Sequence, residues 1–186
     1  DAATVSNNQY TATGRKTITF EGDVDIPGQT FSSSPSLAIP FNTCVLNPDV
    51  INVSGYGQAI ATTDITIEVN LTSPSVGEVV LVVMDPTGDY VSLIASPFPG
   101  PTGANLVNTV FSDAGGSSID VATAPATGTY TSSAWVASGC GLPTMAGPDF
   151  NTWGGGSMNP NGSWTIQAID LGGGAATLDS WSISFP

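Results

Sequence analysis

The sequence predicts an all-β fold, a jelly-roll-like β-sandwich of antiparallel strands. The chain has 22 glycines and 14 prolines among 186 residues, and they interrupt it at short intervals, as turns between short strands do. Several segments alternate apolar and polar residues with a period of two, and no segment has the apolar spacing of an amphipathic helix. Many short strands joined by loops are typical of sandwiches and jelly rolls.

The strands can be placed in chain order from their patterns. Residues 65–71 and 181–185 carry large apolar side chains at every second position, so each is predicted as a strand with one buried face. Residues 79–84 are apolar on both faces and are predicted as a central strand covered on each side, while 164–169 are mixed. Further strands are expected at 18–21, 37–41, 50–54, 90–95 and 106–111.

Turns separate these segments. Residues 85–89, Asp-Pro-Thr-Gly-Asp, predict a tight reversal and hence a hairpin, because proline fixes φ and glycine accepts positive φ. Glycine-rich loops are expected at 154–162 and 171–174, and longer loops at 96–105 and 112–129. We expect one sandwich domain over residues 31–186, with residues 1–30 as an N-terminal extension or donor strand.

The charge composition excludes several classes of function. The chain has 2 Lys or Arg, 15 Asp or Glu and no His, so its formal charge is −13. Nucleic-acid binding and polybasic membrane contacts need cations that it lacks, and no apolar run reaches the roughly 20 residues of a membrane helix. Without histidine the usual base near neutral pH is absent, so we expect no enzyme. A pair of carboxylates acting as in a glycosidase is the alternative that composition leaves open.

The two cysteines indicate where the chain works. Cys44 and Cys140 lie far apart in sequence and lack the CxxC spacing of redox or metal sites. We predict a structural disulfide between them, which places the protein outside the cytosol, as a secreted or cell-surface protein. Two buried thiols are the alternative.

Serine, threonine, asparagine and glycine must cover much of the surface, since charged residues make up 9% of the chain. Such a surface loses little free energy when water is removed from it, because no unpaired ions are buried. Protein partners or self-association are therefore expected, and a glycan is a further candidate.

Acidic residues in loops are candidate metal ligands. Twelve of the fifteen acids are Asp, and loop aspartates among glycine carbonyls suit Ca²⁺, which takes 6–8 oxygen ligands. An ion is expected near Asp113 and Asp170, with Asp85 or Asp149 as a third ligand. The alternative is that these aspartates cap turns locally.

Two tryptophans and one basic segment are candidate contact sites. Trp135 and Trp153 stand in Gly/Ser-rich surroundings and are candidates for stacking on a sugar, with a core or loop-anchoring role as the alternative. The cations Arg15 and Lys16 precede a β-like segment with Ile18 and Phe20. That segment is either an edge strand of the same sandwich or a strand donated to a neighbouring copy, which would build a filament.

Short motifs over residues 35–186 follow one another in a recognisable order. They are Asp64-Ile65-Thr66-Ile67, Met84-Asp85-Pro86-Thr87-Gly88, Phe111-Ser112-Asp113, Gly128-Thr129-Tyr130, Asn161-Gly162-Ser163-Trp164-Thr165-Ile166 with Asp170, and Leu178-Asp179-Ser180-Trp181-Ser182-Ile183-Ser184-Phe185. In this order the chain resembles a divergent proprotein-convertase P-domain (P/Homo B). It lacks the His-Thr pair often seen in that family, and these 186 residues include no protease domain.

The resemblance implies a jelly-roll sandwich without catalysis, attached to secreted subtilisin-like proteases or to bacterial surface proteins. We therefore expect a non-catalytic structural or adhesive module at the cell surface, or a subunit of an extracellular filament. An accessory domain that stabilises a secreted protease and a glycan-binding module are the two alternatives.

Overall fold

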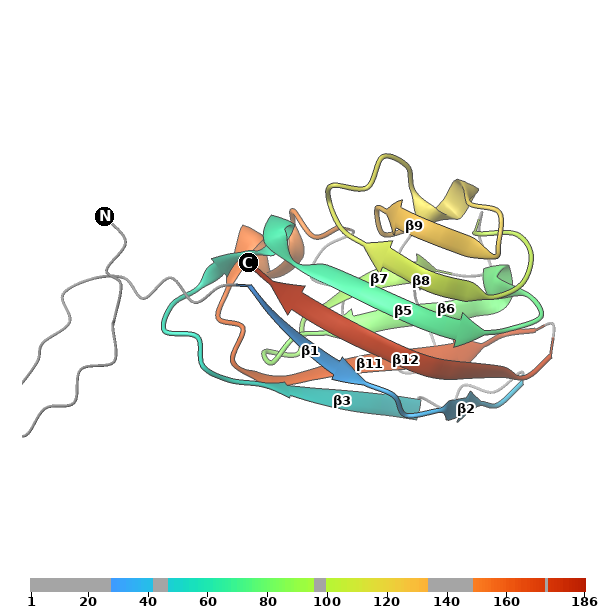
Figure 1. The fold of residues 1–186 in the computed structure, drawn as a ribbon, viewed down its shortest axis with the longest axis horizontal. Coiled ribbons are helices and arrows are strands. Elements are labelled where there is room, and N and C mark those ends of the chain that lie inside the picture. The colour runs from blue at the N-terminus through green and yellow to red at the C-terminus, as the bar shows by residue number, and fades with distance from the viewer. Residues whose placement is uncertain (1–27, 42–46, 96–99, 134–148, 173) are drawn as a thin grey trace, which may run out of the picture.

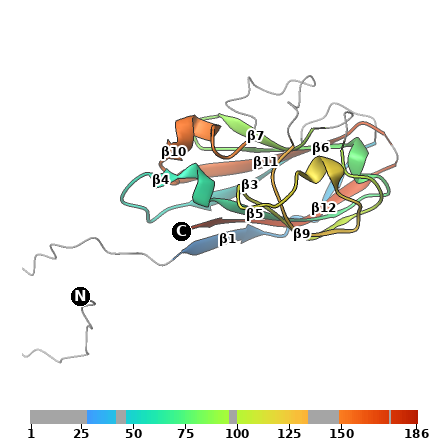
Figure 2. The ribbon, with the colours of Figure 1, turned by 90° about the horizontal axis from the view of Figure 1, so that it is seen from above.

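The fold is a β-sandwich, as the sequence predicts. A computed structural model describes residues 28–41, 47–95, 100–133, 149–172 and 174–186. Over these residues the chain is all-β, and two main sheets pack face to face (Figures 1 and 2). The strands are β1 (Gln29–Ser33), β2 (Leu37–Ile39), β3 (Asn47–Val53), β4 (Ile60–Ala61), β5 (Thr66–Thr72), β6 (Val79–Met84), β7 (Tyr90–Ala95), β8 (Leu106–Phe111), β9 (Ala126–Tyr130), β10 (Ser157–Met158), β11 (Gly162–Asp170) and β12 (Ala176–Phe185).

Short 3-10 turns connect some of the strands. These turns are η1 (Thr62–Asp64), η2 (Val76–Glu78), η3 (Ile119–Val121) and η4 (Trp153–Gly156). None of the helical turns in the described residues has the length and apolar character needed to cross a membrane.

The two sheets differ in strand order. The first, here the β12 sheet, runs β1-β12-β5-β8-β9, with β2 also paired to β12. Its pairs are antiparallel except β8 with β9, which is parallel. The second, the β11 sheet, runs β3-β11-β6-β7 with antiparallel pairs throughout. The small β4–β10 pair lies outside both.

Apolar rows from both sheets form the core between them. In β5, Ile67, Val69 and Leu71 are fully buried, while Glu68 and Asn70 point to the opposite, partly exposed face. β12 repeats the pattern with Ile183 and Phe185 inside. The strands predicted from alternation are confirmed, and burial of each such side chain contributes about 1.5–3 kcal/mol.

The predicted hairpin at 85–89 joins β6 and β7. The Asp85 N–H donates to the Asp89 carbonyl (2.8 Å), the Gly88 N–H donates to the Asp85 carbonyl (3.0 Å), and Gly88 has φ +95°. β6 is buried on both faces and lies between β11 and β7, as its apolar sequence predicts.

Some elements depart from the sequence prediction. The short strands β4 and β10 were not predicted, and all of β9 except Tyr130 lies in the stretch 112–129 expected to be a loop. Nothing in the sequence indicates β9, because its central Thr127, Gly128 and Thr129 are exposed and show no apolar alternation. β1 begins at Gln29 and pairs with the end of β12, so two residues of the segment 1–30 lie in the sandwich. The strand expected at 18–21 lies outside the described residues.

The strand registers define two ends of the sandwich, which matter for the sites below. At the Phe185 end, Ile183 pairs with Ile67 and Ile67 with Phe111, and the Trp164 ring at the start of β11 lies 5.4 Å from the Phe185 ring. At the Ala176 end, β11 finishes at Asp170 and β12 starts.

Candidate functional site

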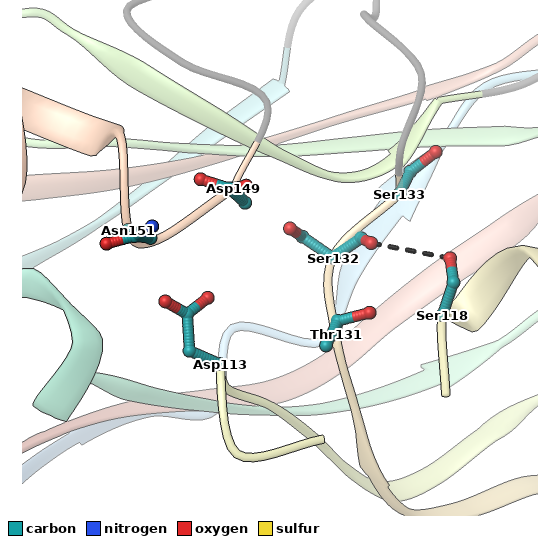
Figure 3. A pocket seen from close by; sticks show the side chains of 7 residues that line it. All are labelled: Asp113, Ser118, Thr131, Ser132, Ser133, Asp149 and Asn151. Carbon is teal, nitrogen blue, oxygen red and sulfur yellow. Dashed lines mark hydrogen bonds between the residues drawn. The ribbon is translucent and has the colours of Figure 1, made fainter. Parts of the chain in front are cut away.

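A polar pocket opens at the Phe185 end and is the first candidate site. It has a volume of about 430 Å³ and is lined by oxygen-bearing side chains from the ends of three segments (Figure 3). Asp113 follows β8, Ser118 precedes η3, Thr131, Ser132 and Ser133 follow β9, and Asp149 and Asn151 precede η4.

Local turn chemistry holds these side chains in place. Ser118 Oγ accepts from the Asp120 N–H (3.2 Å) and donates to the Ser132 carbonyl (3.4 Å), which joins the start of η3 to the chain after β9. Asp149 Oδ1 accepts from the Thr152 N–H (2.9 Å) and from Thr152 Oγ1 (2.7 Å), an Asx-type turn. The pocket is thus a product of capped turns at strand ends.

Two carboxylates share this pocket. In Figure 3, Asp113 points toward the segment that carries Asp149 and Asn151. Burial raises the pKa of Asp113, and the negative charge of Asp149 raises it further, while the Phe150 backbone N–H partly offsets both. With carboxylate, amide and hydroxyl oxygens on its walls, the pocket offers acceptors to a cation or to a hydroxylated molecule.

The structure corrects the predicted set of calcium ligands. Asp113 and Asp149 do share a pocket, but Asp170 lies at the Ala176 end of the sandwich, because β8 and β11 finish at opposite ends. Asp85 also lies away from Asp170, since β6 and β11 are antiparallel. Within the described residues, no three His, Cys, Asp or Glu side chains come together as a metal site.

Asp85 instead organises the β6–β7 turn. Its Oδ1 accepts from the Thr87 N–H (2.7 Å), from Thr87 Oγ1 (2.6 Å) and from the Asp89 N–H (3.2 Å). The local capping role named as the alternative fits this geometry.

Asp170 ends β11 in a fully buried position. Its Oδ1 accepts from the Gly172 N–H (3.0 Å), whereas its Oδ2 is buried and has no hydrogen-bond partner. Burial raises the pKa of Asp170, the Gly172 N–H opposes this, and the charge of Glu78 adds to the rise.

A hydroxyl-rich surface is the second candidate site. The outer face of the β12 sheet, here the hydroxyl face, carries Ser, Thr and Asn side chains in rows, and no described layer packs over it (Figure 2). A groove of about 330 Å³ crosses it. The groove is lined by Thr30, Ser32, Ser33, Ser34, Glu68, Asn70, Ser180, Trp181 and Ser182.

Hydrogen bonds between neighbouring strands order this face. Thr30 Oγ1 and Ser184 Oγ share a hydrogen bond (2.7 Å) between β1 and β12, and Asn70 Nδ2 donates to Ser180 Oγ (3.2 Å) between β5 and β12. Each hydroxyl retains further hydrogen-bonding capacity toward solvent or a partner. Among the described lining residues of the groove, Glu68 is the one acidic side chain, and none of them is basic.

Trp153 cannot stack on a sugar, which corrects that prediction. Its side chain is fully buried in η4, in edge-to-face contact with Trp164 (5.4 Å) and Phe150 (5.7 Å). Both faces of the ring therefore lie in the core, which agrees with the alternative prediction of a core or loop-anchoring role. The other tryptophan candidate, Trp135, lies outside the described residues.

Several further predictions fall outside the part of the chain that the structure describes. They are the disulfide between Cys44 and Cys140 and the self-assembly segment with Arg15, Lys16, Ile18 and Phe20.

Two features went unrecognised in the sequence. The hydroxyl face was foreseeable, because polar residues occupy every second position opposite the apolar rows: Ser180, Ser182 and Ser184, and Thr66, Glu68, Asn70 and Thr72. The approach of Glu78 to Asp170 could not be predicted from the sequence, because it depends on the β6–β11 register, in which Asp170 lies opposite Val79.

Comparison with known proteins identifies no family. No protein-family model matches the chain, and no curated protein matches it. Among solved structures, the fold is similar to part of the serine protease of Aeromonas sobria, with 15% identity over 86% of this chain and a TM-score of 0.46. The structure of that protease in complex with the chaperone ORF2 gives 15% identity and a TM-score of 0.45. The chain spans 26% of the length of the protease chain in each structure.

Proposed function

We propose that the chain is a non-catalytic structural or adhesive module of a secreted or cell-surface assembly, and that the hydroxyl face is its contact surface. The observation on which this proposal rests is the ordered, nearly uncharged outer face of the β12 sheet, with its groove between β1, β12 and β5.

Such a face suits association without chemistry. Burying an unpaired charge costs several kcal/mol, and this face exposes few charges, so a partner can cover it at small desolvation cost. The serine and threonine hydroxyls act as donors and as acceptors, so they can form direct or water-mediated hydrogen bonds with another protein surface.

Composition supports the non-catalytic part of the proposal. The chain has no histidine, and its two cations, Arg15 and Lys16, lie outside the described residues. The carboxylates of the Asp113 pocket therefore face hydroxyl and amide side chains, with no described cation to orient an anionic group or stabilise developing negative charge.

The same proposal takes the resemblance to P-domains as a working family assignment. In that family the sandwich assists folding and stability, so a module acting as an accessory domain would raise the melting temperature of a secreted protease mixed with it. A module that builds an assembly would instead raise the melting temperature only of other copies of this chain.

Electron microscopy and a point variant test the contact surface. We expect negatively stained native secreted material to show ordered assemblies, and Ser182→Glu to reduce them strongly, because it adds a second carboxylate beside Glu68 within the groove. Thr63→Glu is the matched control, since Thr63 is exposed in η1, away from the hydroxyl face.

Assembly of Ser182→Glu at the wild-type level would overturn the assignment of the hydroxyl face. A monodisperse monomer that stabilises a co-secreted protease would favour the accessory role. Substrate turnover lost on changing Asp113 or Asp149 would overturn the non-catalytic proposal.

A further inference from the structure

Two acidic side chains meet at the Ala176 end of the sandwich, where β11 finishes and β6 begins. Asp170 pairs in register with Val79, and the Leu171 N–H donates to the Glu78 carbonyl (2.9 Å). This main-chain bond fixes the residue after Asp170 against the backbone of Glu78. The two acids are therefore held close to each other by the pairing of β6 with β11 and by the Leu171–Glu78 hydrogen bond just beyond the paired residues.

Asp170 is an unusual residue for its position. It continues the inward-facing row of Trp164, Ile166 and Ala168 along β11 and is fully buried. One carboxylate oxygen accepts from the Gly172 N–H, and the other is buried without a partner. A buried carboxylate oxygen with no partner destabilises a fold unless a proton or a cation neutralises it.

Glu78 brings a second carboxylate to the same glycine. A methyl group on Gly172 would lie 3.1 Å from Glu78 Oε1, so the absent side chain lets Glu78 approach. Gly172 thus contacts Asp170 through its N–H and Glu78 across its Cα. The charge of Glu78 adds to the rise in the pKa of Asp170, which agrees with two acids sharing one space.

Nothing basic in the described chain balances this pair. The described residues contain no Lys, Arg or His, because the only two cations of the sequence are Arg15 and Lys16. The neutralising species must therefore come from solvent or from outside the described residues. Main-chain carbonyl oxygens and water are the usual further ligands of hard cations beside carboxylates.

We propose that Asp170 and Glu78 bind a Ca²⁺ ion at the Ala176 end, with main-chain carbonyl oxygens and water as the remaining ligands. Ca²⁺ accepts 6–8 oxygens in flexible geometry, whereas Mg²⁺ requires a near-ideal octahedron and gives up its water reluctantly. Two carboxylates form a sparse ligand set, so we expect a Kd of about 10⁻⁴–10⁻³ M, the range of extracellular modules. This inference does not depend on the proposed function.

Calcium titration of the full chain tests the site. The protein is stripped with EDTA, and its melting temperature and binding heat are measured against CaCl₂ up to about 10 mM and against MgCl₂. We expect Ca²⁺ to raise the melting temperature by roughly 3–10 °C and Mg²⁺ to have a smaller effect. Equal melting temperatures in EDTA and in Ca²⁺ would overturn the proposal.

Variants locate the ion. Glu78→Gln keeps the shape of a half-buried side chain, and we expect it to weaken Ca²⁺ binding at least ~10-fold with the fold intact. Asp170→Asn should abolish the response to Ca²⁺ while the EDTA-treated protein remains folded. Asp149→Asn is the control in the other acidic pair and should bind Ca²⁺ as the wild type does. Wild-type affinity in Glu78→Gln, or affinity lost only in Asp149→Asn, would refute the assignment.

Discussion

The two ends of the sandwich both bring two carboxylates together, but in different surroundings. At the Phe185 end, Asp113 and Asp149 line an open pocket, and the Asp149 carboxylate accepts two hydrogen bonds from Thr152. At the Ala176 end, Asp170 is fully buried with an unpartnered oxygen, and Glu78 lies against the same glycine.

This difference shows that burial, rather than the number of acids, determines which pair requires a counter-charge. In the open pocket, Asp113 and Asp149 are only partly buried and Asp149 accepts from Thr152, so solvent and hydrogen bonds offset part of the repulsion that raises the pKa of Asp113. At the buried end, the same charges lack solvent on one side. We therefore expect cation binding to depend on Asp170 and Glu78 rather than on the two carboxylates of the pocket at the Phe185 end.

The two ends also differ in what a side chain added at a nearby glycine would contact. The largest expected change in stability follows from this difference. A methyl group on Gly115, beside the Asp113 pocket, would lie 2.2 Å from the Tyr130 carbonyl carbon and 2.3 Å from the Thr131 nitrogen, both backbone atoms. We expect Gly115→Ala to lower the free energy of unfolding by about 3 kcal/mol and the melting temperature by roughly 6–12 °C.

The neighbouring glycine provides the control for that change. A methyl group on Gly116 would meet nothing within 4 Å, so Gly116→Ala should leave the melting temperature close to that of the wild type. Equal melting temperatures for the two variants would show that the chain after β8 does not pack tightly on the end of β9.

The next effect tests the buried end by pH, with Ca²⁺ removed by EDTA. The raised pKa of Asp170 means that the folded state holds this proton more tightly than the unfolded chain does. Its contribution to stability is complete below the ordinary Asp pKa and is lost as pH rises through the raised value. Asp170→Asn removes that loss, so at pH 7 the variant should be more stable than the wild type by about 1–3 kcal/mol.

Urea unfolding at pH 4 and pH 7 measures this difference. The advantage of Asp170→Asn should shrink as pH falls from 7 to 4, because the raised pKa makes the folded wild type take up its proton at a higher pH than the unfolded chain does. Asn and a neutral Asp both place an uncharged group in the core. Greater stability of the wild type at pH 7 in EDTA would indicate that the Oδ2 atom has a partner after all.

A smaller effect is expected at the open pocket, where the charge and the hydrogen bond of Asp149 can be separated. Asp149→Ala removes the acceptor of the Thr152 N–H and should cost about 1 kcal/mol. Asp149→Asn keeps an acceptor oxygen and should cost less. Both remove a negative charge beside Asp113, so the pKa of Asp113 should fall in both, as followed by NMR titration of its carboxyl. An unchanged pKa would contradict the pairing of these two acids.

The sequence was sufficient for the elements whose side chains alternate or are uniformly apolar. β5, β6, β7 and β8 lie within one residue of their predicted bounds, because burial of one or both faces leaves a pattern along a single strand. β9 left no such pattern, since its exposed Thr-Gly-Thr centre packs little and its parallel partner, β8, is joined to it by a long connection.

The candidate sites were only partly predictable, for a topological reason. The sequence marks Asp113 and Asp170 as loop acids but contains no information on which end of the sandwich each strand reaches. That depends on the order β11-β6 in one sheet and β12-β5-β8 in the other. The pairing of Asp170 with Glu78 and of Asp113 with Asp149 therefore became visible only from strand registers and turns.

The smallest effect on stability belongs to Gly172, the counterpart of Gly115 at the buried end. A methyl group there would meet the end of the flexible Glu78 side chain, at 3.1 Å, rather than backbone. Because that side chain can turn away, Gly172→Ala should change the free energy of unfolding by about 0.5 kcal/mol or less. The displaced Glu78 carboxylate should nevertheless weaken Ca²⁺ binding several-fold, measured by calorimetry in parallel with Glu78→Gln. Unchanged Ca²⁺ affinity in a folded Gly172→Ala variant would mean that Glu78 does not need its present approach to Asp170.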